Sequence, residues 1–322
     1  MIKNIVTGAT GFLGGELARE LRKRGEKVVG VGRNIVKGNL LKEAGIEFLE
    51  LDLTDKNRTI NLLGDCDYIF HCSALSSDFG RYASFYNANV VATQNVINTC
   101  FVHKVKRLIY VSTPSVYSDT RHHLGLTEES LFASPLNYYA KTKQQAEKLI
   151  DEARERGLDV VTIRPRAIVG KHEDKILSRL IHINKRGIPF IDGGRAKIDL
   201  TSIENVVHAL ILARDKGNPG AHYNITNGEP YSFAEIVELF FAKAGIALNK
   251  REIGFYQAYC LTYGMEVVGK LKGLEEIPFT RYAVCSIGRS QTFDLTKARS
   301  ELGYEPIKPI KTTLAEIAND FR

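Results

Sequence analysis

The segment NYYAKTK, residues 137–143, places two tyrosines and two lysines in less than two turns of a predicted helix. A phenol beside a reacting carbonyl can act as a general acid, and a lysine one turn away favours its ionised form. Residues four apart share a helix face, so Tyr139 pairs with Lys143. Tyr138 has Thr142 at that spacing instead. We therefore predict Tyr139 as the acid, with Lys143 lowering its pKa, and Tyr138 in packing or on the substrate side.

The segment TGATGFLG, residues 7–14, carries three glycines between a predicted strand and a predicted helix. In that context the glycines let the backbone approach a pyrophosphate at the helix N-terminus. A plain strand-to-helix turn needs one glycine, so the pattern predicts a dinucleotide site. The contacts that we expect from this loop come from Gly8, Thr10, Gly11, Phe12, Leu13 and Gly14.

The residues after the second and third predicted strands bear on the choice of cofactor. An acidic residue about 20 residues past the glycines usually holds the ribose of NAD, whereas a nearby arginine suits the 2′-phosphate of NADP. Here Arg33 and Asn34 follow the second strand, which predicts NADP(H) as the preferred cofactor. NAD(H) is the alternative if Arg33 is only a surface residue. Asp52 and Leu53 are placed to meet the adenine, although Asp52 could equally cap a turn.

The chain alternates short β-rich runs with amphipathic stretches. The runs are residues 4–8, 27–32, 46–51, 68–72, 107–112, 159–165 and 221–226, and the helical stretches include residues 13–24, 82–102 and 137–156. This alternation predicts an α/β fold, a parallel sheet doubly wound with helices on both faces. We expect a dinucleotide-binding domain over residues 1–165, completed by residues 200–227. Residues 166–199 and 228–322 form a smaller C-terminal lobe for the substrate.

Composition narrows the class of protein. The chain has 322 residues, 44% of them hydrophobic, and a net charge of +7 from scattered basic residues. Nucleic-acid binders carry a basic stripe with aromatic residues, so no nucleic-acid partner is expected. The five cysteines lack metal-ligand spacing and suit a reducing compartment, so we expect no metal. With no signal region and no transmembrane run, the expected location is cytoplasmic.

Five motifs in order resemble the extended short-chain dehydrogenase/reductase family. They are TGATGFLG, FHCSA at 70–74, NVVATQNV at 89–96, YVSTPSVY at 110–117, and YAKTK followed by Glu147. The resemblance implies the dinucleotide fold with strand order 3-2-1-4-5-6-7 and a Tyr/Lys catalytic pair. It assigns the substrate-oxygen contact to Thr113, with Ser112 and Ser115 nearby, and places Asn89 near the active site. Further cofactor contacts implied by it are Cys72, Ser73, Ala74, Asn89, Tyr139, Lys143 and Pro165.

Three departures separate the chain from the sugar-nucleotide members of that family. Ala167 stands where epimerases carry an asparagine, and Pro114-Ser115 stands where dehydratases carry an acidic pair. Ile198 replaces an arginine beside Asp199. A nucleotide-sugar epimerase or dehydratase is therefore the rival enzyme hypothesis. An NADP-sensing regulator is the rival without catalysis, and such regulators commonly lose the Tyr/Lys pair.

The C-terminal segment, residues 277–306, resembles the 3β-hydroxysteroid dehydrogenase branch, with TRY at 280–282 as its most specific motif. This branch includes bacterial reductases of 2-alkyl-3-oxoalkanoic acids. The resemblance implies an NADP(H)-dependent hydride transfer to a 3-oxo group on a hydrophobic substrate, steroid-like or with a long acyl chain. Family members often form homodimers through the helices at 82–102 and 137–156. For the segment after Asp294 the structural alternative is a helix with a glycine cap that packs the lobe together.

The segment 255–271 is predicted as a helix with one apolar face, made by Tyr256, Tyr259, Cys260, Tyr263, Val267 and Leu271. The opposite, wetter face carries Gln257, Glu266 and Lys270. We expect the apolar face to form a lid or wall of the substrate pocket, and the alternative is a helix that packs into the core. The substrate contacts that we expect are Ser115, Tyr138, Tyr259 and Tyr263.

Overall fold

The computed structural model describes residues 2–171 and 176–321. Its largest element is a parallel sheet of seven strands in the order β12-β7-β5-β4-β1-β2-β3. The strands are β1 (Lys3–Thr7), β2 (Lys27–Gly32), β3 (Glu47–Glu50), β4 (Tyr68–His71), β5 (Arg107–Val111), β7 (Val160–Pro165) and β12 (His222–Ile225). Counted along the chain within this sheet, the order is 3-2-1-4-5-6-7. The predicted fold and strand order are confirmed.

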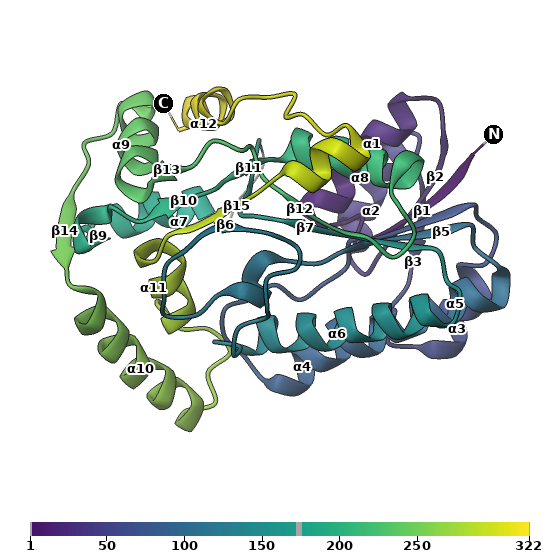
Figure 1. Ribbon diagram of the computed structural model, residues 1–322, viewed down its shortest axis with the longest axis horizontal. Coiled ribbons are helices and arrows are strands. Elements are labelled where there is room, and N and C mark those ends of the chain that lie inside the picture. The colour runs from purple at the N-terminus through teal and green to yellow at the C-terminus, as the bar shows by residue number, and fades with distance from the viewer. Residues whose placement is uncertain (1, 172–175, 322) are drawn as a thin grey trace.

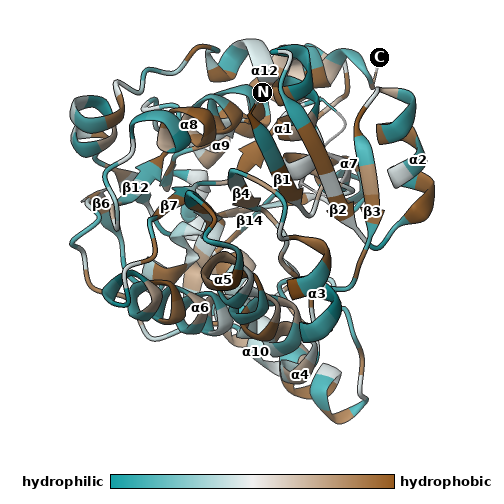
Figure 2. Ribbon diagram, turned by 90° about the vertical axis from the view of Figure 1, so that its right-hand side faces the viewer, coloured by the Kyte–Doolittle hydropathy of each residue, from teal (hydrophilic) through white to brown (hydrophobic). Residues whose placement is uncertain are grey.

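Helices cover both faces of the large sheet (Figures 1 and 2). One face carries α1 (Phe12–Lys23), α2 (Ile35–Glu43) and α8 (Ile203–Lys216), and the other carries α3 (Lys56–Leu62), α5 (Ala92–His103) and α6 (Tyr138–Glu155). Successive strand residues point to opposite faces, so β1 supplies both cores. Val6 belongs to the buried cluster of Leu17 on α1, and Ile5 belongs to the cluster of Val96 on α5.

The strand order places a crevice at the carboxyl ends of β1 and β4. From β1 the chain continues to β2 on one side of the sheet, whereas β4 lies on the other side of β1. In open parallel sheets, ligands bind at this switch point, outside the carboxyl ends of the strands. The loops that follow β1, β2, β4, β5 and β7 therefore meet at one edge.

Smaller sheets and helices form the rest of the molecule, gathered at the left of Figure 1. Strands β13-β10-β15-β6 make one sheet, and β11-β8 and β14-β9 make two pairs. Their bounds are β6 (His123–Leu126), β8 (Ile168–Val169), β9 (Ile188–Ile191), β10 (Lys197–Ile198), β11 (Thr201–Ser202), β13 (Tyr231–Ser232), β14 (Lys250–Ile253) and β15 (Gln291–Phe293). The helices are α7 (Ile176–Asn184), α9 (Phe233–Ala244), α10 (Phe255–Leu271), α11 (Arg281–Gly288) and α12 (Ile310–Asn319), with the short turns η2 (Pro114–Tyr117) and η3 (Asp192–Gly194).

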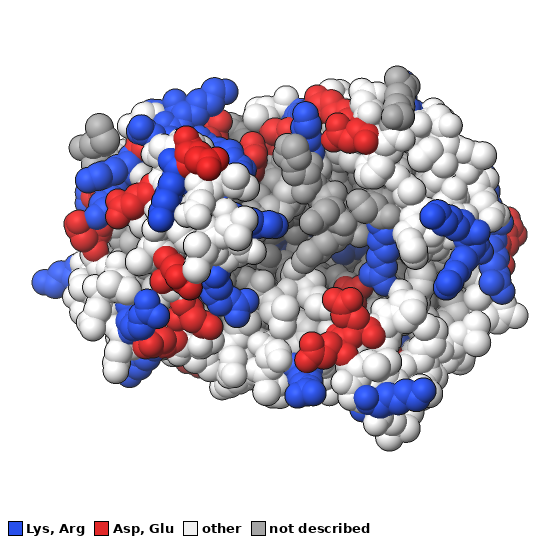
Figure 3. Space-filling view, turned by 180° about the vertical axis from the view of Figure 1, so that it is seen from behind, with Lys and Arg blue, Asp and Glu red and all other residues white. Residues whose placement is uncertain are grey.

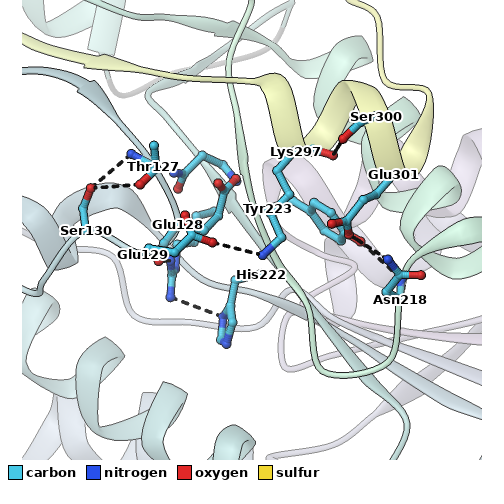
Figure 4. A network of polar contacts seen from close by, with 12 residues as sticks. Thr127, Glu128, Glu129, Ser130, Asn218, His222, Tyr223, Lys297, Ser300 and Glu301 are labelled. Atoms are coloured by element: carbon cyan, nitrogen blue, oxygen red, sulfur yellow. Dashed lines mark hydrogen bonds and ion pairs between the residues drawn. The ribbon is translucent and has the colours of Figure 1, made fainter.

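The edge strand β12 is tied to the C-terminal segment by polar contacts (Figure 4). The Tyr223 hydroxyl donates to Glu301 Oε2 at 2.6 Å, and Asn218 Nδ2 donates to the same oxygen at 2.8 Å. Glu301 lies in the π-helical turn η4 (Ala298–Leu302), which ends at Gly303 with φ 67°. The helical turn and its glycine cap are as the structural alternative predicted, but the segment packs onto the large sheet and not within the smaller lobe.

The predicted helix 82–102 is interrupted by a wide turn. It consists of α4 (Tyr82–Tyr86), the π-helical turn η1 (Asn87–Val91) and α5. A π-turn inserts one extra residue into the helix and is frequent at functional sites. Asn89, predicted near the active site, lies in this turn and is buried.

Helix α10 is present as predicted, but the predicted orientation of its apolar face is wrong. Tyr256 and Leu271 are 76% and 83% exposed, whereas Glu266, assigned to the wetter face, is buried. The other residues of the helix that are buried are Phe255, Ala258, Thr262 and Gly269. Glu266 is buried because Arg281 pairs with it at 2.8 and 2.9 Å. Small residues dominate the packed face because α10 lies close to its neighbours, and at Gly269 a Cβ would meet Phe79 at 3.0 Å.

The distribution of charged side chains on the surface agrees with the scattered basic residues of the sequence. On the face drawn in Figure 3, basic and acidic groups are interspersed, without a continuous basic stripe. Among the described residues, no helix has the length and hydropathy needed to cross a membrane.

Candidate active site

The glycine loop after β1 is tightly packed and leaves the start of α1 open. Gly8 has φ 69°, and a Cβ there would lie 2.9 Å from the backbone of Ser73. A Cβ at Gly14 would lie 2.4 Å from the Gly8 carbonyl oxygen. Gly11 is the N-cap, with no side chain bonded to the helix and no acidic residue in the first turn. These features leave free N–H groups for an anionic group, so the loop fits the pyrophosphate of a dinucleotide.

The rim after β2 carries an exposed cation. The Arg33 side chain is 75% exposed and lies 3.9 Å from Asp52. Asp52 accepts hydrogen bonds from the N–H and hydroxyl of Thr54, at 2.9 and 2.8 Å, which lower the pKa of Asp52. Asp52 therefore caps a turn, as the alternative predicted. Asn34 is the N-cap of α2 and accepts from the Lys37 N–H at 3.0 Å.

Lys143 is fully enclosed behind the candidate acid. Its Nζ donates to the carbonyl of Val111 at 2.7 Å and lies 4.2 Å from the centre of the Tyr110 ring. Burial lowers the pKa of Lys143 to about 7, against the opposing effects of Glu147 and the Cys72 thiol. A lysine in this state is partly protonated at neutral pH and can serve as a hydrogen-bond donor to a neighbouring group.

Tyr139 is brought together with Thr113, the residue predicted to hold the substrate oxygen. The Thr113 hydroxyl lies close enough to the Tyr139 hydroxyl to oppose the rise in its pKa, and Thr113 is buried just after β5. Burial raises the pKa of Tyr139 above its usual value, and Tyr282 and Asp78 add to the rise. The predicted lowering of this pKa by Lys143 is therefore wrong, because loss of solvent around the phenol dominates. Tyr139 remains protonated at neutral pH, which is the form that a general acid needs.

Tyr282, which was not among the predicted site residues, also reaches this cluster. Its hydroxyl lies 2.6 Å from Ser115 Oγ, and Ser115 Oγ accepts from Thr113 Oγ1 at 3.0 Å. Tyr282 is the last residue of the TRY motif, 167 positions from Ser115 along the chain. Its membership of the TRY motif was the only signal in the sequence that pointed to it, because residue spacing cannot reveal contacts between segments far apart in the chain.

Asn89 connects three elements around the candidate acid. Its Oδ1 accepts from the Leu75 N–H at 2.7 Å, and its Nδ2 donates to the Leu75 carbonyl at 3.1 Å. Nδ2 also donates to Thr142 Oγ1 on α6 at 3.0 Å. Its own carbonyl accepts from Thr93 Oγ1. Asn89 thus fixes the loop after β4 against the helix that carries Tyr139.

Tyr138 faces away from the Tyr139 hydroxyl cluster, into aromatic packing. Its ring lies 5.4 Å from Tyr82 and 6.4 Å from Phe85, and Lys270 of α10 lies 5.4 Å from the ring centre. The two adjacent tyrosines therefore have different environments, as the helix-face argument predicted. The contact with Lys270 places Tyr138 where α6 meets α10.

Tyr259 and Tyr263, the two substrate contacts predicted on α10, lie against the first residue of α11. Both rings contact the Arg281 guanidinium, at 5.7 and 4.7 Å, and Tyr259 stacks on Phe255. Tyr263 is half exposed. These contacts place the two rings between α10 and the start of α11.

Other predicted cofactor contacts surround the crevice. The N–H of Ser73 donates to Thr7 Oγ1 at 3.3 Å, which holds the loop after β4 beside the glycine loop. Leu53 and Pro165 are buried at strand ends, Cys72 is half-buried and Ala74 is exposed. The structure thus places them around one edge of the sheet.

A buried ion pair joins α6, the helix that carries Tyr139, to β7. Arg164 of β7 donates to both carboxylate oxygens of Glu147, at 3.0 and 2.5 Å, and Ser112 donates to the same carboxylate. Arg164 also donates to the Tyr117 hydroxyl. Both charged side chains are almost fully buried. Glu147 was noted only as part of a motif, and its partner lies 17 residues away on another element.

Comparisons with known proteins agree with this geometry. The model of the NAD dependent epimerase/dehydratase family matches residues 4–226. The chain belongs to the NAD dependent epimerase/dehydratase family. It is 32% identical to 2-alkyl-3-oxoalkanoate reductase of Stenotrophomonas maltophilia, over 98% of each chain. It is 31% identical to 3beta-hydroxysteroid-dehydrogenase/decarboxylase isoform 2 of Arabidopsis thaliana, over 87% of this chain and 53% of that protein.

A solved structure, MoeE5 in complex with UDP-glucose and NAD, superposes with a TM-score of 0.77. It is 25% identical, and the match covers 99% of this chain and 98% of that one. The predicted family and its 3β-hydroxysteroid dehydrogenase-like branch are confirmed by these relatives. This family member is an NAD(P)-dependent oxidoreductase.

Proposed function

We propose that this family member uses NADPH to reduce the 3-oxo group of a hydrophobic substrate. The observation that supports it best is the proximity of a protonated Tyr139 to the buried Thr113 hydroxyl, with Lys143 four residues further along the same helix. This arrangement offers two hydroxyl donors to one ketone oxygen. Relatives of the same branch are named for reduction of 2-alkyl-3-oxoalkanoates and for dehydrogenation of 3β-hydroxysteroids.

The residues around the crevice fit a dinucleotide. Gly8, Gly11 and Gly14 would hold the pyrophosphate, and Arg33 would pair with a 2′-phosphate. Asp52 and Leu53 would lie beside the adenine. When bound, NADPH supplies a hydride to the carbonyl carbon of the substrate.

The chain's own residues complete the reduction. As the carbonyl carbon gains the hydride, the carbonyl π-electron pair moves to the oxygen, and Tyr139 transfers its proton to that oxygen. Thr113 donates a hydrogen bond to the same oxygen and stabilises the developing negative charge. Lys143, whose Nζ donates to the Val111 carbonyl, would also donate to the ribose of the cofactor. The product is the 3-hydroxy compound.

Two features argue against the rival sugar-nucleotide activity. Ala167, at φ 38°, stands in place of the epimerase asparagine. Pro114 and Ser115, in place of the dehydratase acidic pair, form the first turn of η2. Neither position offers a side-chain amide or carboxylate for sugar chemistry.

Oxidation of NADPH, followed at 340 nm with a panel of ketones, tests the proposal. The panel contains 3-ketosteroids, 2-alkyl-3-oxoalkanoates, short 3-oxo acids and UDP-sugars with NAD. Turnover of the hydrophobic 3-oxo compounds is expected. Conversion of a UDP-sugar without net cofactor oxidation would instead establish the epimerase, and cofactor binding with no turnover would favour the regulator.

A further inference from the structure

The start of α11 is held firmly beside the candidate active site. Thr280 is its N-cap and accepts from the Ala283 N–H at 3.1 Å. The N–H of Arg281 donates to Glu266 Oε1 at 2.7 Å, and its guanidinium pairs with Oε2. Glu266 is buried on α10. The first two residues of the TRY motif therefore fix the backbone position of the third, Tyr282.

Tyr282 ends a row of four hydroxyl groups. The Thr113 hydroxyl lies near that of Tyr139 and influences its pKa. Thr113 Oγ1 donates to Ser115 Oγ at 3.0 Å, and the Tyr282 hydroxyl lies 2.6 Å from Ser115 Oγ. Ser115 and Thr113 are both buried. The row joins α6, the turn after β5 and α11.

The number of protons in this row limits how it can serve a ketone. Each hydroxyl has one proton to donate. Thr113 Oγ1 already accepts from the Ser115 N–H at 3.2 Å, and it directs its own proton to Ser115 Oγ. Thr113 can donate to a ketone only if this bond reverses and Ser115 becomes the donor. Ser115 Oγ then needs a donor of its own, and the adjacent Tyr282 hydroxyl can supply it.

We propose that Tyr282 is a positioning residue for the reduction, donating to Ser115 so that Ser115 donates to Thr113 and Thr113 donates to the substrate oxygen. This inference rests on the proposed function and adds a residue to it. All three protons then point toward the developing negative charge, and each hydrogen bond strengthens the next. The lobe that carries α11 thereby acts on the ketone without touching it.

Replacement of Tyr282 by phenylalanine removes one hydroxyl and keeps the ring. We expect Tyr282→Phe to lower kcat about fivefold, the effect of a hydrogen bond of about 1 kcal/mol, because the contact matters most in the transition state. The KM for the ketone and the Kd for NADPH should change less than about twofold. Tyr231→Phe is the matched control, since its hydroxyl bonds to Glu229 at 3.2 Å in the same part of the molecule. An unchanged kcat in Tyr282→Phe, or a loss confined to KM, overturns the proposal.

A double variant separates positioning from general stability. Because Tyr282 acts only through Ser115, Ser115→Ala with Tyr282→Phe should have the same kcat as Ser115→Ala alone. Losses that multiply in the double variant overturn the proposal. The thermal midpoint of each variant is measured in parallel, and a lowered midpoint does not by itself produce this non-additive pattern.

A readout that needs no turnover distinguishes this inference from the proposed function. Tyrosine labelled with ¹³C at Cζ reports the hydrogen bonds of each phenol by NMR. The Tyr139 resonance should move in Tyr282→Phe, should lose that response when Ser115 is already alanine, and should stay fixed in Tyr231→Phe. If wild type reduces no ketone but shows these shifts, the hydroxyl row is established while the proposed function fails. A Tyr139 resonance indifferent to Tyr282→Phe refutes the row.

Discussion

At the scale of single residues, burial decides the chemistry of the candidate site. Tyr139 and Lys143 have their usual pKa values shifted in opposite directions by the same cause, loss of solvent. The raised pKa keeps the Tyr139 phenol protonated, and the lowered pKa of Lys143 lies close to neutral pH. Tyr139 therefore keeps its proton until the ketone oxygen takes it, while Lys143 is only partly protonated at neutral pH.

Replacement of Tyr139 by phenylalanine should lower kcat by about 10² to 10⁴, the usual contribution of a general acid, with NADPH affinity nearly unchanged. Tyr138→Phe is the control, because its ring packs among Tyr82 and Phe85 and has little part in the chemistry. Steady-state kinetics and cofactor titration measure both effects. Equal losses in the two variants would mean that the wrong tyrosine was assigned.

The rate of reduction should depend on the protonation of Lys143. Burial lowers the pKa of Lys143 to about 7, so its ammonium is present below pH 7 and is lost as the pH rises above it. Tyr139 stays protonated throughout this range, because its pKa is raised. We expect kcat/KM to fall above about pH 7. Glu147→Gln should move this inflection to lower pH, since the carboxylate supports the ammonium, and a flat profile through pH 9 would contradict the assignment.

The choice of cofactor should depend on Arg33. Loss of a charge-assisted contact with the 2′-phosphate is worth about 1.5 to 3 kcal/mol, so Arg33→Ala should weaken NADPH binding at least about tenfold. NADH has no 2′-phosphate, and its affinity should not change. Fluorescence titration of both cofactors measures this. A wild type that prefers NADH would show that Arg33 is only a surface residue.

At the scale of elements, α10 shows how a helix can bury its polar residue and expose its apolar ones. Its packed face is made of Phe255, three small residues and Glu266, which holds Arg281 of α11. Tyr256 and Leu271 point outward. The helix is thus a support for the TRY motif, and hydrophobicity alone does not identify its inner face.

Substitutions on the two faces of α10 should differ in how much stability they cost. Glu266→Gln leaves the partly buried Arg281 without a charged partner and should cost about 2 to 4 kcal/mol in the free energy of unfolding. Leu271→Ser on the exposed face should change it by less than about 0.5 kcal/mol. Urea denaturation measures the free energy of unfolding of both variants. A larger loss of stability from Leu271→Ser than from Glu266→Gln would show that the apolar face of α10 is the packed one, as the sequence predicted.

At the scale of the whole molecule, the large sheet depends on distant segments. Strand β12 pairs with β7 and completes the sheet, while α8 packs against α1. One buried cluster includes Val6, Leu210 and Tyr304. Strand β6 lies within residues 1–165, the predicted dinucleotide-binding domain, but it pairs with β15 outside the large sheet. We propose that residues 200–227 are an indispensable part of the dinucleotide-binding domain.

A fragment that ends at residue 165 should therefore fail to fold on its own. It would expose the edge of β7 and the face of the sheet that α8 covers, and such edges promote aggregation. The full chain should unfold in a single transition in circular dichroism, and size-exclusion chromatography should show the fragment aggregated. A monomeric fragment with native NADPH affinity would contradict this dependence.

The local pattern of the sequence was sufficient for the sheet and the main site. Short β-rich runs, helical spacing and glycines between a strand and a helix are local features of the sequence. They were sufficient to predict β1, the loop from Gly8 to Gly14 and the Tyr139/Lys143 pair. The family resemblance added Thr113 and Asn89, which the structure brings beside Tyr139.

The tertiary structure alone decided which groups are buried together. The raised pKa of Tyr139, the inner face of α10 and the contact of Tyr282 with Ser115 all depend on segments far apart in the chain. Burial and long-range contacts are properties of the packed molecule, because they arise only when helices and strands exclude water between them. The spacing of residues along the chain therefore does not predict burial or long-range contacts.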